Sequence, residues 1–178
     1  MMNPLAELAV AVSSLPDPQT VKKWEFAGYD RWISVCGVGL AEIGGDEELP
    51  GMPGHVYKLA DPFSSSEAWP GGDLPNKQVF LASSTPALRN NLLRAVRQAS
   101  NSLIRGEKLM VFCHLGRSRS PLVATAAVML AFQCEPLDAW VQISTAHDVA
   151  PLSVLGLSAL VWLADECQLI GGEKNAVL

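Results

Sequence analysis

A single segment, LMVFCHLGRSRS (109–120), holds a cysteine, a glycine and an arginine at a spacing that suits anion chemistry. Cys113 follows an apolar run that predicts a buried strand, and the stretch after Arg119 has the pattern of a helix. If residues 114–118 wrap into a loop, their backbone N–H groups and the first N–H groups of the helix converge on an anion site. Gly116 permits the tight turn, and Arg119 can grip two phosphate oxygens at once.

The same placement makes Cys113 a candidate nucleophile, because a helix N-terminus and a neighbouring arginine both favour a thiolate. A thiolate beside a bound phosphoester can displace the ester oxygen and form a phosphocysteine, which water then hydrolyses. The leaving oxygen needs a proton, so a carboxylic acid should overhang the pocket. The candidate phosphate-binding residues are His114, Leu115, Gly116, Arg117, Ser118 and Arg119. This chemistry needs no metal or cofactor, and no ligand cluster for a metal is evident, so activity should survive chelators.

The elements around this segment alternate between strands and helices. Strands are expected at 8–12, 31–38, 55–60, 78–82 and 109–112, helices at 17–29, 86–105, 121–132, 136–146 and 152–167, and loops at 39–54 and 62–78. This order predicts an α/β fold with a central mixed, mainly parallel sheet and helices on both faces. The chain of 178 residues fits one domain over 1–178, and no internal repeat is evident.

Composition restricts the classes of function. A net charge of −5 argues against an extended nucleic-acid surface. The longest uncharged runs are too short to span a membrane, and Glu7 interrupts an apolar N-terminus that lacks the basic start of a signal peptide. The four cysteines (Cys36, Cys113, Cys134, Cys167) are far apart and form no Cys-x-x-Cys pair. We therefore expect free thiols in a cytoplasmic protein, and the sequence leaves the oligomeric state open.

The stretch VFCHLGRSRSPLVATAAVML (111–130) resembles the signature of the dual-specificity subgroup of the protein tyrosine phosphatases. There, Cys-x-x-Gly-x-x-Arg-Ser precedes a long apolar helix. A weaker resemblance covers most of the chain: the opening strand, the helix before WISVCGV (32–38), a strand that ends in aspartate and two closing helices. Low-molecular-weight phosphatases carry the motif near the N-terminus, whereas here it is central. The resemblance implies removal of phosphate from tyrosine, serine and threonine of phosphorylated proteins through a phosphocysteine.

Carried over to this chain, the resemblance gives roles to further residues. Ser120 would hydrogen-bond the Cys113 thiolate and help it to leave in the second step. The general acid would be an aspartate on the loop after a strand, where Asp61 fits because YKLAD (57–61) ends a predicted strand. Asp73 is the rival candidate, since it is nearer to the cysteine in the sequence. Phe112 departs from the family, which has histidine immediately before the nucleophile.

Other residue types have plainer interpretations. His55 and His147 are interpreted as structural or surface residues, and Arg89, Arg94 and Arg97 as the solvated face of the 86–105 helix. The tryptophans are assigned mostly to the core, with Trp69 as a candidate for the substrate entrance. The five tryptophans are Trp24, Trp32, Trp69, Trp140 and Trp162.

Two alternative functions stay open. His114 and Arg117 place basic groups in the loop, as do phosphoinositide and inositol-polyphosphate phosphatases of the same superfamily, and RNA 5′-phosphate phosphatases are a further variant. The third possibility is a pseudophosphatase that binds phosphorylated partners without turnover. That role goes with a broken motif, whereas Cys113, Gly116 and Arg119 are all present.

Overall fold

A four-stranded sheet forms the centre of the computed structural model, which describes residues 9–45 and 51–172, with side chains as far as 167. The strands are β1 (Val10–Ser13), β2 (Arg31–Ser34), β3 (Gly54–Val56) and β4 (Leu109–Phe112). Their order is β1-β4-β2-β3, and every strand pair is parallel. Because parallel strands end at one edge, the residues that follow β1, β2, β3 and β4 meet there.

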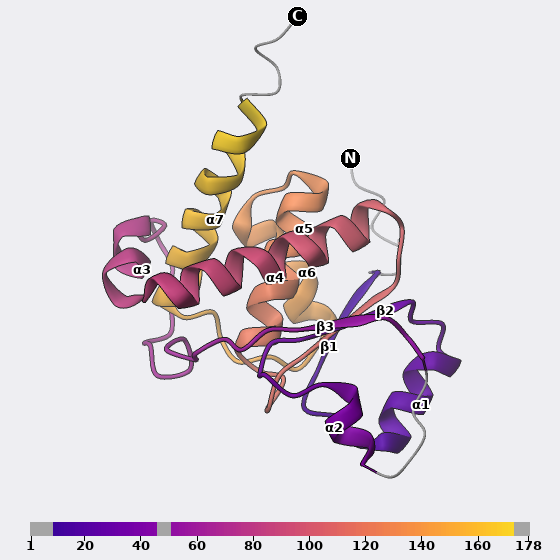
Figure 1. Cartoon of the computed structure of the whole chain (residues 1–178). Coiled ribbons are helices and arrows are strands. Elements are labelled where there is room, and N and C mark those ends of the chain that lie inside the picture. Colours follow the sequence, from indigo (N-terminus) through magenta and orange to yellow (C-terminus); the bar gives the residue numbers. More distant parts are fainter. Residues whose placement is uncertain (1–8, 46–50, 173–178) are drawn as a thin grey trace, which may run out of the picture.

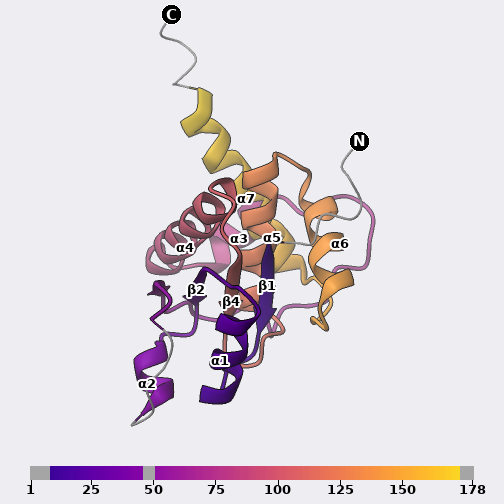
Figure 2. The same cartoon turned by 90° about the vertical axis from the view of Figure 1, so that its right-hand side faces the viewer.

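Helices cover both faces of this sheet. They are α1 (Pro18–Phe26), α2 (Leu40–Gly44), α3 (Lys77–Ser83), α4 (Pro86–Ile104), α5 (Arg119–Phe132), α6 (Pro136–Ala146) and α7 (Val154–Gly172). Figure 1 shows α4 and α5 on one face, with α3, α6 and α7 beyond them, and α1 and α2 on the other face. Figure 2, turned by 90°, shows the same division of the helices between the two faces of the sheet. This arrangement confirms the predicted α/β class, with a sheet that is parallel throughout.

β4, one of the two inner strands, is buried along its whole length, as its four apolar residues predict. On one face it packs against α5, which is apolar on nearly all sides. On the other face the Phe112 ring lies between two tryptophans, 5.7 Å from the Trp24 ring of α1 and 6.0 Å from the Trp32 ring of β2. The residue before Cys113 is therefore part of the hydrophobic core.

The Trp32 ring also crosses β3. A Cβ added to Gly54 would lie 2.1 Å from the Trp32 ring, so only glycine fits at this position. The indole Nε1 donates to the Met52 carbonyl at 2.8 Å, which satisfies the polar end of this buried ring. This contact fixes the course of the short strand that leads toward Asp61.

Two predicted segments differ in the structure. The 78–82 stretch forms helix α3 and not a strand: the Asn76 side chain accepts from the Gln78 N–H, and the Phe80 ring packs 5.2 Å from Trp162 of α7. A helical cap and tertiary packing thus override the β propensity of a short apolar run. The 39–54 segment, expected to be a loop, contains helix α2, in which Glu42 accepts from the Gly39 N–H. Its residues 46–50 lie outside the described part of the chain.

A charged cluster ties the connection between α4 and β4 to the start of β2. Both oxygens of Glu107 accept from Arg31, at 2.9 and 3.2 Å, and from Arg105, at 3.0 and 3.1 Å. These hydrogen bonds, from Arg105 first and then Arg31, lower the pKa of Glu107 from 4.5 to about 2. The ionised carboxylate is therefore the form that stabilises the fold.

We predict that Glu107→Gln lowers the free energy of unfolding at pH 7 by about 1 kcal/mol, because it removes a partly exposed ion-pair network. A lowered pKa in the folded state stabilises above the unfolded value, and this contribution disappears as pH falls from about 4.5 to about 2. Urea unfolding across this pH range should show the variant and the unmodified protein converging. Glu25→Gln, at an exposed position of α1, is the control. A pH-independent difference would contradict the prediction.

Candidate active site

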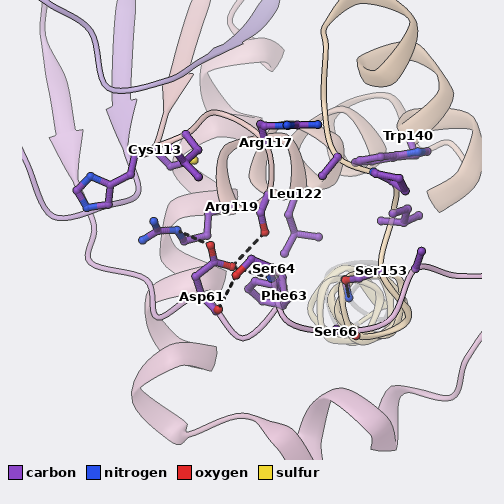
Figure 3. A pocket seen from close by; sticks show the side chains of 18 residues that line it. Asp61, Phe63, Ser64, Ser66, Cys113, Arg117, Arg119, Leu122, Trp140 and Ser153 are labelled. Atoms are coloured by element: carbon purple, nitrogen blue, oxygen red, sulfur yellow. Dashed lines mark hydrogen bonds and ion pairs between the residues drawn. The ribbon is translucent and has the colours of Figure 1, made fainter.

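A pocket of about 420 Å³ lies where β4 ends and α5 begins. It is lined by residues of the cysteine loop (113–119), of the segment after β3 and of the connection between α6 and α7. Figure 3 shows Cys113, Arg119 and Asp61 on one side and Trp140, Ser66 and Ser153 on the other, with Leu122 between them. The lining residues are Asp61, Phe63, Ser64, Ser66, Ala68, Cys113, His114, Leu115, Arg117, Ser118, Arg119, Leu122, Trp140, Ala150, Pro151, Leu152, Ser153 and Gly156.

Cys113 lies at the base of the pocket and is only 2% exposed. Its Sγ is 3.2 Å from the hydroxyl of Ser120, in the first turn of α5. The Ser120 Oγ is also 3.5 Å from the Ser13 carbonyl, so β1 helps to orient it. The structure thus brings the predicted nucleophile and its predicted hydroxyl partner into contact.

The loop 114–118 is held from outside. The His114 carbonyl accepts from the Leu15 N–H and the Arg117 carbonyl from the Ala150 N–H, both at 3.1 Å. No hydrogen bond joins the backbone N–H groups of 114–119 to another described residue. With these two carbonyls engaged outside and its N–H groups free, the loop has the hydrogen-bonding pattern of an anion-binding nest.

Gly116 makes the closest approach of this loop to the rest of the protein. Its φ is +69°, and an added Cβ would lie 2.5 Å from the Ser14 nitrogen and 2.6 Å from the Ser13 carbonyl carbon. Glycine is therefore required at this position for two reasons: it adopts a positive φ without strain, and it has no side chain to clash with the backbone of Ser13 and Ser14. The glycine of the motif sets the loop against the end of β1.

Arg119 connects the cysteine loop with the segment after β3. Its Nη1 donates to the Leu59 carbonyl at 3.0 Å, and its Nε is 3.3 Å from Asp61 Oδ2. The other Asp61 oxygen accepts from the Ser118 hydroxyl at 3.0 Å and from the Ser64 N–H at 3.1 Å. Figure 3 shows the contacts of Asp61 with Arg119, Ser118 and Ser64 as dashed lines. The carboxylate of Asp61 is thereby fixed beside the guanidinium, within the same pocket as Cys113.

The segment after Asp61 is anchored to the start of α7. Ala68 and Ser153 form an isolated antiparallel bridge. The Val154 N–H donates to the Glu67 carbonyl at 2.9 Å, and the Leu155 N–H donates to the Ser66 hydroxyl at 3.2 Å. Residues 63–68, which belong to the predicted loop 62–78, thus form a wall of the pocket.

The rival carboxylate, Asp73, is exposed and is not among the residues that line the pocket. His55, which stacks on Tyr57, and His147 also lie outside the pocket lining. Burial lowers the pKa of His147 below its ordinary value of 6.5. Of the two predicted aspartates, therefore, the fold brings only Asp61 to the cysteine.

Two sequence interpretations need correction. Trp69, the candidate for the entrance, packs against the core and does not line the pocket, whereas Trp140 packs against the core as predicted and also lines the pocket. A sequence gives no signal for this, because Trp140 reaches the pocket only through the packing of α6 on α5. Arg89 is not simply solvated: it donates to the Leu81 and Ser84 carbonyls at the end of α3.

All four cysteines are free. Burial raises the pKa of the Cys134 and Cys167 thiols above 9.0, so these two ionise less readily than an exposed cysteine. Among the described residues, no three His, Cys, Asp or Glu side chains are placed to hold a metal ion. No helix in the described part of the chain is both long and apolar enough to cross a bilayer.

Several solved structures are similar to this chain. Human DUSP28 has 17% identity and a TM-score of 0.59, with 91% of this chain and 95% of that chain covered. A mouse putative dual specificity phosphatase complexed with zinc tungstate has 18% identity and a TM-score of 0.60, covering 92% and 86%. PTPMT1 in complex with PI(5)P has 15% identity and a TM-score of 0.58, covering 91% and 94%. No protein-family model and no curated protein sequence matches the chain.

These likenesses confirm the resemblance that the 111–130 segment suggested: the chain has the fold of the dual-specificity phosphatases and related members of the protein tyrosine phosphatase superfamily.

We predict that Gly116→Ala lowers the affinity for inorganic phosphate by at least about tenfold. It should also lower the free energy of unfolding by about 1–3 kcal/mol. The reason is the clash of the new Cβ with the backbone of Ser13 and Ser14. Gly106→Ala is the matched control, because Gly106 also has positive φ (+74°) but has no atom within 4 Å of an added Cβ. Isothermal calorimetry measures the affinity for phosphate, and urea unfolding measures the stability. Equal losses in the two variants would assign the effect to φ alone.

Proposed function

We propose that this protein is a phosphoric monoester hydrolase that dephosphorylates tyrosine, serine or threonine side chains of proteins through a phosphocysteine. The observation that carries the proposal is the arrangement of the pocket. Cys113 lies at its base in contact with Ser120, and Arg119 and Asp61 are paired in the same pocket. A nucleophile, an anion clamp and a proton donor are the three groups that this reaction requires.

In the first half-reaction the Cys113 thiolate attacks the phosphorus atom. The S–P bond forms as the bond between phosphorus and the ester oxygen breaks, and protonated Asp61 gives its proton to that oxygen. The free N–H groups of 114–119 and the Arg119 guanidinium bind the phosphoryl oxygens as charge develops on them. The Ser118 hydroxyl and the Ser64 N–H hold the Asp61 carboxyl in position.

In the second half-reaction water attacks the phosphocysteine. The new O–P bond forms as the S–P bond breaks, and the Asp61 carboxylate accepts the proton that water loses. The leaving group is now the Cys113 thiolate, and the Ser120 hydroxyl 3.2 Å away donates to it as its charge develops. Both half-reactions thus use the same residues, without a metal or cofactor.

The comparisons give one specific reason to keep a second substrate class. PTPMT1, whose fold is similar, is solved in complex with PI(5)P, and Arg117 is an exposed base at the rim of the pocket here. Phosphoinositides are therefore the alternative substrate. The pseudophosphatase alternative is the less favoured one, because the nucleophile, cradle and arginine are together. We place the activity in the cytoplasm, where thiols stay reduced.

We predict that Cys113→Ser abolishes hydrolysis of para-nitrophenyl phosphate but keeps binding of inorganic phosphate, because the cradle is made of backbone N–H groups and Arg119. Arg119→Lys should lower kcat/KM by about 10²–10³-fold, since an ammonium cannot form the paired contacts of a guanidinium. Arg97→Lys, on the exposed face of α4, is the control. Turnover by the Cys113→Ser variant would exclude the phosphocysteine mechanism.

We predict that Asp61→Asn slows alkyl phosphates far more than aryl phosphates with acidic phenols. A general acid contributes about 10²–10⁴-fold, but only when the leaving oxygen needs a proton. Asp73→Asn is the matched control, because Asp73 is exposed outside the pocket. Steady-state kinetics over a series of leaving groups measure the effect. Leaving-group dependence in Asp73→Asn, and not in Asp61→Asn, would reverse the assignment.

A further inference from the structure

The charged side chains of the pocket come from one part of its lining. Its charged side chains are Asp61, Arg117 and Arg119, with His114 as a further base. All but Asp61 belong to the cysteine loop or the first turn of α5, and Asp61 is paired with Arg119. The wall formed by 63–68, Leu122 and 140–156 contributes no charged group to the lining. This uncharged wall extends the pocket well beyond the phosphate cradle.

The serines in that wall are already hydrogen-bonded within the protein. The Ser66 hydroxyl accepts from the Leu155 N–H, and the Ser153 hydroxyl accepts from the Gly156 N–H at 3.0 Å. The Ser64 hydroxyl donates to the Asp61 carbonyl at 3.3 Å. These serines serve to cap α7 and to shape the loop after Asp61. The rest of the wall is apolar and includes Phe63, Leu122, Trp140, Pro151 and Leu152.

Trp140 and Leu122 are held in place by elements that carry the catalytic groups or pack on them. Leu122 is one helical turn after Arg119 on α5, so the two side chains share a face of that helix. Trp140 follows Ala139 on α6, whose buried face includes Ala139 and Ile143 and packs against α5. Its ring is therefore at the edge of the α6 core face, directed to the pocket (Figure 3).

We propose that this apolar wall selects phosphomonoesters with an aryl leaving group, and that Trp140 is the residue that determines the selection. The inference rests on the proposed function and deepens it. An aromatic ring beside the phosphate gains from burial against Leu122 and Leu152 and from ring contact with Trp140. A short polar alkyl group gains neither. A polyphosphorylated headgroup would find cations for its further phosphates only at Arg117 and His114 of the loop, and none among the lining residues of the wall itself.

The test uses Cys113→Ser, which binds without turnover, and isothermal calorimetry with phenyl phosphate, glycerol 3-phosphate and inositol 1,4,5-trisphosphate. Phenyl phosphate should bind about tenfold more tightly than glycerol 3-phosphate. Adding Trp140→Ala should remove most of this advantage and leave glycerol 3-phosphate within about twofold, whereas Trp140→Phe should keep most of it. Val141→Ala, at an exposed neighbour that does not line the pocket, is the control.

The outcomes separate the two proposals. If the Cys113→Ser variant binds none of these phosphates, the proposed function itself is wrong. If it binds phenyl phosphate and glycerol 3-phosphate equally, or the trisphosphate most tightly, the function stands and the aryl selection is overturned. The comparison of ligands with Trp140 intact decides this even if Trp140→Ala fails to fold.

Discussion

Backbone N–H groups that point into an anion site cannot also hold their loop in shape, because a donor engaged elsewhere is lost to the ligand. The loop 114–119 meets this constraint by using its carbonyls. Those of His114 and Arg117 accept from Leu15 and Ala150, and Gly116 packs against the backbone of Ser13 and Ser14. The end of β1 and the connection between α6 and α7 therefore act as the two outer supports of the cradle.

Arg119 has a structural role in addition to its proposed role in binding the anion. Arg119 donates to the Leu59 carbonyl and pairs with Asp61, so it joins the cysteine loop to a segment more than fifty residues earlier. The wall that follows Asp61 is then fixed on α7 through Ser66 and Ala68. The position of Asp61, the proposed acid, thus depends on three separate elements: the cysteine loop, the segment after β3 and the start of α7.

Phe112 makes the position before Cys113 part of the aromatic core. The signature that residues 111–130 resemble has a histidine at this position, whereas this chain has a phenyl ring between Trp24 and Trp32. An imidazole there would lose ring contacts and bury a polar nitrogen. Orientation of Cys113 is left to the parallel pairing of β4 with β1 and to the Ser120 hydroxyl.

The sequence by itself determined the strand, loop and helix around Cys113, because that chemistry is local: the cysteine, glycine and arginine lie within seven consecutive positions. It also predicted the α/β class from the alternation of apolar runs. The place of Asp61 beside Arg119, the use of Trp140 in the pocket and the helical state of 78–82 were decided only by the tertiary structure. Each depends on contacts between segments far apart in the chain, such as Arg119 with Asp61 and Phe80 with Trp162. Spacing and periodicity describe neighbours along the chain, and they do not encode which distant segments meet.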